Sequence, residues 1–217
     1  MGIDNKQLFA LAEADDAAAL LEALGPTDSY CVRNENGETL FLFSLFRGRA
    51  KCVEAMKAHG VLTMHEAAAI GDTRRIEEWA RAAPWTIQSL SADGWTALHL
   101  AAFLGHDEAI AKLLDLGADA RQWARSFEQN LAIHAAAAGR RIARPAYARL
   151  IAATGDPDVP QKRGYTALMI AASDGFADGA EALLAAGADK SKKLPDGKTA
   201  AAIARERGHE ELARRLA

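Results

Sequence analysis

Disulfides, membrane spans and export signals all lack support in this sequence. Only two cysteines, Cys31 and Cys52, occur in 217 residues, too few to staple a chain of this size and outside any metal-ligand spacing. No segment approaches the roughly 20 apolar residues of a membrane span. The first residues are polar and acidic where a secretory signal is basic and then apolar, and Lys6 stands where a myristoylation signal needs Ser or Thr. We therefore expect a soluble, cytoplasmic protein.

The chain also carries little net charge. Its 26 Lys and Arg residues and 29 Asp and Glu residues leave −3, which argues against binding nucleic acid through the overall field. Residues 1–108 hold 9 basic and 16 acidic residues, a balance of −7, and residues 109–217 hold 17 and 13, a balance of +4. Such a division could guide an oppositely charged partner into one register, although a chance distribution gives splits of this size as well.

Motifs of catalysis are missing too. The glycines never cluster as a phosphate-binding loop or a dinucleotide fingerprint requires. No serine or cysteine lies in a recognisable nucleophile setting. Adjacent acidic residues such as Glu77 and Glu78 point in different directions when they lie on a helix. We therefore expect neither an enzyme nor a cofactor or metal site.

What the sequence has in abundance is apolar residues and repetition. Half of the residues are hydrophobic, and alanine runs such as 135–138 favour helices whose backbones approach closely. The segment DGWTALHLAAFLGHDEAIAKLLDLGAD, Asp93–Asp119, recurs in altered form along the chain. Gly71 and Gly105 lie 34 residues apart, and Gly164 and Gly197 lie 33 residues apart. The chain is therefore built from a repeating unit of about this length.

Each recurring position in the unit has a physical reason. Gly94 stands in a turn where a residue without a side chain can take positive φ. Thr96 can then cap the free amides that open a helix, and Gly105 can end that helix in a left-handed conformation. The paired leucines Leu113 and Leu114 mark a second helix. Because one such helix pair cannot bury its own apolar face, stacked copies must supply the core.

This unit resembles the ankyrin repeat. The resemblance implies an all-α solenoid of about six to seven helix-turn-helix units with short β-turn fingers, and it covers nearly the whole chain as a single domain. The first unit is degenerate, as expected of an amino-terminal cap, and the last has the polar exterior of a carboxy-terminal cap. The predicted units are 4–35, 36–60, 61–92, 93–128, 129–162, 163–195 and 196–217.

Two segments depart from the repeat. Gly60 is followed almost at once by the helix start at Leu62–His65, so we expect one finger to be missing and a notch to separate the second and third units. The unit around Asn130–Gly155 lacks the turn glycine and threonine and gains about two residues around Gly139–Pro145. We expect a loop to bulge there that carries Arg140, Arg141 and Arg144.

The histidines have a structural interpretation in such a repeat. His65, His99 and His134 fall on the histidine of the family's Thr-Pro-Leu-His motif, which forms bonds between adjacent repeats, and His106 and His209 follow glycines that end helices. The resemblance therefore implies structural roles for these side chains instead of catalysis or metal binding.

The usual binding surface of ankyrin proteins is concave, built from the finger tips and the exposed face of each first helix. Trp95 and Phe103 lie there by register and are large where solvent alone favours a small polar residue. We expect an apolar patch around Trp95, Phe103 and Trp123, rimmed by charge; alternatively, Phe46 and Phe103 pack against neighbouring first helices. The expected contact residues are Phe46, Arg47, Ile70, Trp95, Phe103, Leu104, Trp123, Arg125, Tyr165, Ser173 and Asp174.

The resemblance implies a non-catalytic module that binds a protein partner. The short chain, rich in alanine and arginine, is similar to the small stand-alone ankyrin proteins of bacteria. We expect a monomer that binds neither nucleic acid nor membrane. Within this class the sequence leaves open an inhibitor or immunity factor and an adaptor that joins two proteins. The alternative is an effector delivered to another cell, where it occupies a host protein.

Overall fold

Helix pairs follow one another along the whole of the described chain. The computed structural model describes residues 4–27, 32–60 and 62–217, and within these ranges it contains fourteen α-helices, one short 3-10 helix and no strand. The expected all-α solenoid is therefore confirmed. Consecutive helices form seven pairs, called units 1 to 7 below, each with the loop, or finger, that precedes it. The first helices of the pairs are α1 (Asn5–Glu13), α3 (Leu40–Phe46), α5 (Met64–Ala69), α7 (Ala97–Leu104), α9 (Ala132–Gly139), α11 (Ala167–Asp174) and α13 (Ala200–Glu206), and the second helices are α2 (Ala17–Leu24), α4 (Ala50–His59), α6 (Thr73–Ala82), α8 (Asp107–Asp115), α10 (Arg144–Thr154), α12 (Ala177–Ala185) and α14 (Glu210–Leu216).

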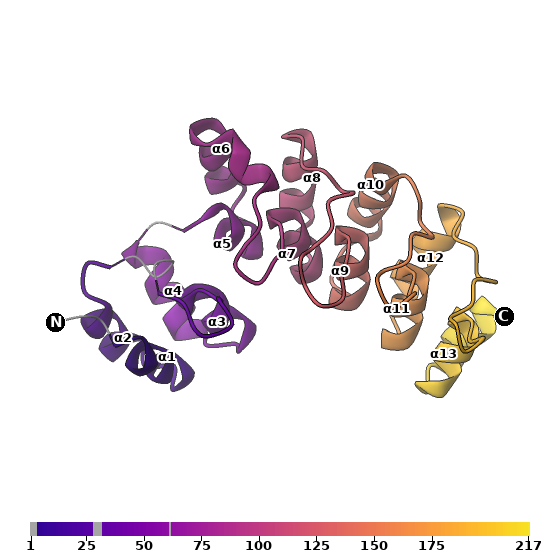
Figure 1. Ribbon diagram of the computed structural model, residues 1–217, viewed down its shortest axis with the longest axis horizontal. Coiled ribbons are helices and arrows are strands. Elements are labelled where there is room, and N and C mark those ends of the chain that lie inside the picture. The colour runs from indigo at the N-terminus through magenta and orange to yellow at the C-terminus, as the bar shows by residue number, and fades with distance from the viewer. Residues whose placement is uncertain (1–3, 28–31, 61) are drawn as a thin grey trace.

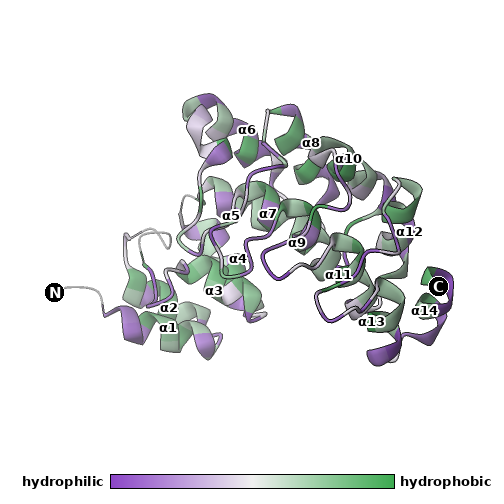
Figure 2. Ribbon diagram, turned by 45° about the vertical axis from the view of Figure 1, so that its right-hand side comes forward, coloured by the Kyte–Doolittle hydropathy of each residue, from purple (hydrophilic) through white to green (hydrophobic). Residues whose placement is uncertain are grey.

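The two sets of helices form two layers of an arch. In Figure 1 the first helices α5, α7, α9 and α11 follow the inner side of the arch, and the second helices α6, α8, α10 and α12 follow its outer side. Helix α7 packs against α5 and α9, while α8 packs against α6 and α10. Fully buried alanines such as Ala101 and Ala136 allow the first helices to approach closely. Figure 2 shows that α14, at the carboxy-terminal end, is largely hydrophilic, as a solenoid cap requires.

Local sequence explains where the first helices begin and end. In α7 the Thr96 side chain accepts a hydrogen bond from the His99 amide, and Gly105 ends the helix at a φ of 76°. Unit 5 departs from this pattern as expected. Leu131 stands at the cap, and Gln129 takes the place of the turn glycine at a φ of 48°. Threonine caps also begin α3, α5, α11 and α13.

The finger of unit 3 is missing, as the sequence predicts, because α4 ends at His59 and α5 begins at Met64. The predicted open notch is wrong, however. A Cβ atom added to Gly37, in the finger of unit 2, would lie only 2.8 Å from the Cβ atom of Ala92 in the finger of unit 4. These two fingers therefore meet across the vacant place. Beneath them lies a cavity of about 240 Å³, lined by side chains that include Leu42, Met64 and Trp85.

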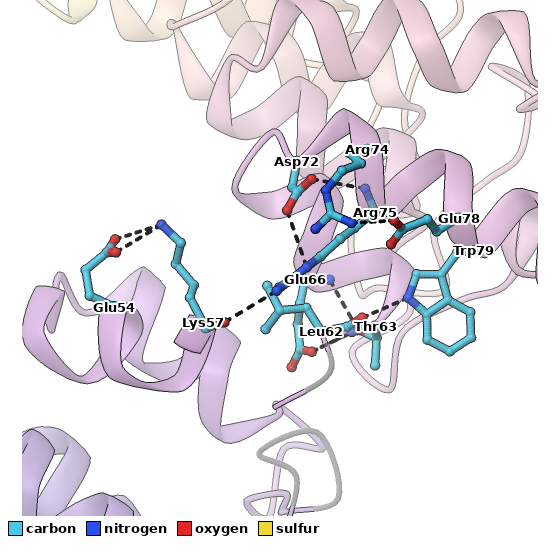
Figure 3. A network of polar contacts seen from close by, with 10 residues as sticks. All are labelled: Glu54, Lys57, Leu62, Thr63, Glu66, Asp72, Arg74, Arg75, Glu78 and Trp79. Atoms are coloured by element: carbon cyan, nitrogen blue, oxygen red, sulfur yellow. Dashed lines mark hydrogen bonds and ion pairs between the residues drawn. The ribbon is translucent and has the colours of Figure 1, made fainter. Parts of the chain in front are cut away.

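The core is divided at the same joint. One cluster of buried hydrophobic residues runs from Met64 to Leu216. The other runs from Leu8 to Leu62 and crosses the joint, since it also includes Ala69 of α5 and Leu100 of α7. On the outer side, Arg75 donates a hydrogen bond to the Lys57 carbonyl oxygen at 3.4 Å, and the Trp79 indole donates to the Leu62 carbonyl oxygen at 2.8 Å. Figure 3 shows these contacts reaching from α6 toward the end of α4. An open cavity of about 400 Å³ lies beside them.

The arginine loop between α9 and α10 is present. It spans residues 140–143, whereas residues 105–106 suffice between α7 and α8. Arg140 adopts a left-handed φ of 56°, and Arg141 lies against Gly105 of the preceding unit. Arg144 is not in the loop as predicted but is the first residue of α10, where Pro145 follows it in a position that suits a helix start. The Ala143 amide donates to the Asp107 side chain at 3.0 Å, so the loop is fixed to unit 4.

Candidate functional site

Three aromatic side chains meet on the inner side of the arch. Phe46 is the last residue of α3, Phe103 lies in the last turn of α7, and Trp95 lies in the finger of unit 4. The rings of Phe46 and Phe103 lie 6.4 Å apart at 71°, and those of Trp95 and Phe103 lie 5.6 Å apart at 88°. These are edge-to-face contacts, a favourable geometry for aromatic rings. We call Phe46, Trp95 and Phe103 the inner aromatic cluster.

The inner aromatic cluster bridges the joint between the two core regions. Phe46 reaches Phe103 past α5 because that helix is short and its last residue, Ala69, is buried. Ile70, Leu104 and Trp95 are half-buried and pack against the core cluster that runs from Leu8 to Leu62 and includes Ala69 and Leu100. Phe46 retains 39% of its surface in contact with solvent. The two phenylalanines therefore pack on each other and still offer apolar surface.

Trp123 lies apart from this cluster. Its ring stacks on the His134 ring at a centroid distance of 6.4 Å, and 42% of its surface is exposed. The structure therefore joins Trp95 and Phe103 with Phe46, where the sequence suggested Trp123 as the third member. Arg125, in the same finger as Trp123, is exposed, and its amide donates to the Gly94 carbonyl oxygen at 2.8 Å.

Two exposed aromatic residues were missed by the sequence analysis. Trp85 lies in the 3-10 helix η2 (Pro84–Gln88) before the finger of unit 4 and is 71% exposed. Phe127 lies in the finger of unit 5 and is 78% exposed, with the Lys162 ammonium 5.6 Å from its ring centre. Both stand in connecting segments outside the repeating pattern, where only the presence of an aromatic residue in a loop could have identified them.

The cation next to the cluster on its amino-terminal side is neutralised. The Arg47 guanidinium lies 3.7 Å from Glu13, 3.8 Å from Glu38 and 3.8 Å from the centre of the Phe43 ring. These contacts fix Arg47 in place and balance its charge with two carboxylates. Arg47 is thus exposed as expected, but it is already paired within the chain.

The predicted residues Tyr165, Ser173 and Asp174 come together in a recess on the carboxy-terminal side. This recess has a volume of about 230 Å³ and also includes Arg163 and Arg207. Arg163 lies 3.5 Å from the carboxylate of Glu128, and Arg140 donates to the Asp174 carbonyl oxygen at 2.9 Å. The recess therefore gathers side chains from units 5, 6 and 7 around one tyrosine.

Three histidines, the buried His99 and His134 and the partly buried His65, connect neighbouring units, as expected from the repeat. His99 bonds the Asn130 carbonyl oxygen at 3.0 Å, His134 bonds that of Val159 at 2.9 Å, and His65 bonds that of Ser89 at 3.0 Å. Burial lowers the pKa of His99 and of His134 to about 4, so both rings are neutral at pH 7. His106 and His209 likewise reach carbonyl oxygens of the preceding units.

The register of unit 3 needs one correction. His99 and His134 are the third residues of their helices, but the third residue of α5 is Glu66, and His65 is the second. Glu66 is fully buried and accepts a hydrogen bond from the Thr39 hydroxyl at 2.6 Å and from the Thr63 amide at 2.9 Å. Burial raises the pKa of Glu66, against the lowering effect of these hydrogen bonds. Its carboxyl group links units 2 and 3.

Within residues 4–27, 32–60 and 62–217 no group of three or more His, Cys, Asp or Glu side chains is arranged to hold a metal ion. In the same ranges no helix has both the length and the apolar character needed to cross a membrane.

Comparison with known families agrees with this architecture. A family model for ankyrin repeats, in three copies, matches residues 8–123 and 133–217. The interruption at 124–132 falls in the finger of unit 5, where Gln129 and Leu131 replace the usual glycine and threonine. Comparison with curated proteins gives no match. The stacked helix pairs, the threonine caps and the family match together show that the chain belongs to the ankyrin-repeat family.

Proposed function

We infer that this chain is a non-catalytic module of protein–protein interaction, since ankyrin repeats serve that role and the members of this family are typically non-catalytic. We propose that this chain binds a protein partner on the inner side of its arch, with the inner aromatic cluster at the centre of the contact. The observation that carries the proposal is the edge-to-face group of Phe46, Trp95 and Phe103, which keeps apolar surface open to solvent.

Energetic reasoning supports this choice of centre. Aromatic residues in the middle of an interface commonly provide most of the binding energy, and truncation of a true hot spot costs about 2 kcal/mol or more. The cluster residues already hold one another in place, so little side-chain entropy is lost when a partner covers them. At the corresponding inner position, units 6 and 7 carry Ser173 and Glu206, which shows that an aromatic residue is not required there by the fold.

The buried ionisable groups support a binding role without catalysis. In His99 and His134 the Nε2 atom bonds the next unit, and the Nδ1 atom bonds the cap residue of its own helix. Glu66 uses its carboxyl group for the caps of α3 and α5. We further propose that the chain acts in the bacterial cytoplasm as a monomer, either as an inhibitor or immunity factor or as an adaptor. Each of these roles needs a stable surface that holds at least one protein.

The test is affinity capture from a lysate of the source cells with three purified chains. The wild type and a Trp85→Ala control, which removes an exposed tryptophan outside the cluster, should retain the same protein in stoichiometric amount. The variant Trp95→Ala/Phe103→Ala should lose it while keeping its helical circular dichroism spectrum. Equal capture by all three chains would refute the proposed site, and turnover of a small substrate by the purified chain would refute a purely binding role.

A further inference from the structure

The arginines on the two sides of the inner aromatic cluster differ in whether carboxylates of the chain neutralise them. On the amino-terminal side, Arg47 is held by Glu13 and Glu38, and Arg49 by Glu13. On the carboxy-terminal side, Arg125 and Arg207 form no ion pair with any residue that the structure describes. Arg140 is exposed and bonds only a backbone carbonyl oxygen among the described residues. Three arginines without an ion pair among the described residues therefore lie on the carboxy-terminal side. On the amino-terminal side the described part of the unit 2 finger has one, Arg33, which is exposed and bonds the Gly37 carbonyl oxygen.

Some of the arginines on the carboxy-terminal side line the recess around Tyr165. Arg163 and Arg207 both line it. Of the two acidic residues that also line it, Glu128 is paired with Arg163. Arg140 bonds the backbone carbonyl oxygen of Asp174, and the Asp174 carboxylate forms no ion pair among the described residues. An arginine fork suits a carboxylate well, since it can donate two parallel hydrogen bonds. A carboxylate of a partner can therefore enter beside the Tyr165 ring and meet arginine.

We propose that the bound partner presents a segment with an apolar anchor and, on one side of that anchor, several acidic side chains. The anchor covers the inner aromatic cluster, and the acidic side chains pair with Arg125, Arg140 and Arg207. This inference rests on the proposed function and adds the chemistry of the partner to it. The arrangement also gives a structural form to the charge division of the sequence, with −7 in residues 1–108 and +4 in residues 109–217.

The two parts of this surface should affect binding in different ways. Burial of the aromatic cluster governs how slowly the complex dissociates, because the rings are the desolvated centre. Exposed arginines at the rim act mainly on the rate of association and make the affinity depend on salt. An acidic segment therefore binds more weakly as ionic strength rises, and this salt dependence requires the three arginines.

The experiment uses the full chain and a phage-displayed library of random short peptides as the probe. Peptides retained by the wild type should contain Trp, Phe or Leu together with Asp or Glu on one side of it. One retained peptide, labelled with fluorescein, is then titrated with three variants. These are Trp95→Ala/Phe103→Ala, the inner reversal Arg125→Glu/Arg140→Glu/Arg207→Glu, and the outer reversal Arg74→Glu/Arg149→Glu/Arg214→Glu.

The outer reversal is the matched control, because it changes the net charge by the same amount on the second helices α6, α10 and α14. The inner reversal should lower the affinity for the peptide about tenfold or more at low salt, and it should remove most of the salt dependence of this affinity. The outer reversal should change the affinity less than about twofold. Enrichment of neutral or basic peptides, no enrichment at all, or equal effects of both reversals would overturn the inference.

The design separates this inference from the proposed function. If the aromatic variant loses the peptide but the peptide is not acidic, the binding site stands and the acidic partner is refuted. If the aromatic variant binds as well as the wild type, the proposed site itself is refuted. A fluorescein-labelled thymidine oligonucleotide serves as the competing anion. If it binds as tightly as the peptide and its binding depends on the same arginines, the inference of an acidic protein segment is refuted in favour of nucleic acid.

Discussion

Units 1 and 2 are joined to the rest of the solenoid differently from the way units 4 to 7 are joined to one another. Neighbouring fingers of units 4 to 7 share hydrogen bonds, from the Arg125 amide to Gly94 at 2.8 Å and from the Lys162 amide to Glu128 at 3.2 Å. Across the joint at residues 60–63, the fingers of units 2 and 4 touch at Gly37 and Ala92, and no hydrogen bond connects these two fingers within their described residues.

The comparison teaches how a solenoid can continue after losing a finger. In units 4 and 5 a neutral histidine reaches forward to the next finger. In unit 3 the corresponding helix position holds Glu66, which reaches backward to the capping hydroxyl of Thr39. A buried carboxyl group thus connects the two regions where the finger cannot. The inner aromatic cluster crosses the same joint, so the proposed binding site depends on it.

Acid should have the largest effect and should act first on the larger region. His99 and His134 have pKa values of about 4 in the folded chain, below the ordinary histidine value of 6.5, because both rings are buried. Because folding depresses these pKa values, their contribution to stability is complete above pH 6.5 and is lost as the pH falls toward 4. The loss is on the order of 3 kcal/mol for each histidine. Among the described residues of units 1 and 2 the only histidine is His59, which is exposed.

Hydrogen exchange followed by mass spectrometry, at pH 7 and at about pH 4.5, measures this difference unit by unit. After correction for intrinsic exchange rates, peptides from α7 and α9 should lose protection before those from α1 to α4. A His99→Gln/His134→Gln variant should show a smaller difference between the two pH values. Earlier loss of protection in units 1 and 2 would contradict the assignment of acid sensitivity to these histidines.

Replacement of Glu66 by alanine should have the next largest effect and should separate the two regions. The change leaves the Thr39 hydroxyl and the Thr63 amide without their partner in a buried place, at a cost of about 3 kcal/mol. Because the carboxyl group links units 2 and 3, urea unfolding should change from one transition to two. The control Glu78→Ala removes an exposed glutamate paired with Arg74 and should cost less than about 0.5 kcal/mol. A single, equally stable transition in Glu66→Ala would show that this carboxyl group does not couple the regions.

Most of the fold could be predicted from the sequence because each repeat marks its own boundaries. Thr96, Gly105 and their equivalents act on the nearest helix turn, so their meaning is local and can be read without the rest of the molecule. The missing finger could be predicted for the same reason, since too few residues separate Gly60 from Met64.

The candidate site could be predicted only in part, because its members meet through packing between units. The contact between Phe46 and Phe103 depends on how far the short helix α5 separates its neighbours. The closed notch depends on the direction of two fingers, which no single repeat determines. The assignment of His65 failed by one residue, because Thr63 begins α5 and places Glu66 at the position of the usual histidine.

The smallest expected effect tests whether the contact between the fingers of units 2 and 4 stabilises the joint. Gly37 has a φ of 79°, and its added Cβ atom would lie 2.8 Å from Ala92, whereas Gly197 has a φ of 85° and no neighbour within 4 Å of such an atom. Alanine at Gly197 therefore carries only backbone strain, about 1 kcal/mol. Alanine at Gly37 carries similar strain and also forces the two fingers apart. Urea unfolding should show Gly37→Ala to be less stable than Gly197→Ala by about 1 kcal/mol, with the extra loss confined to units 1 and 2. Equal stability of the two variants would mean that these fingers only lie near each other and that Glu66 and the aromatic rings alone hold the joint.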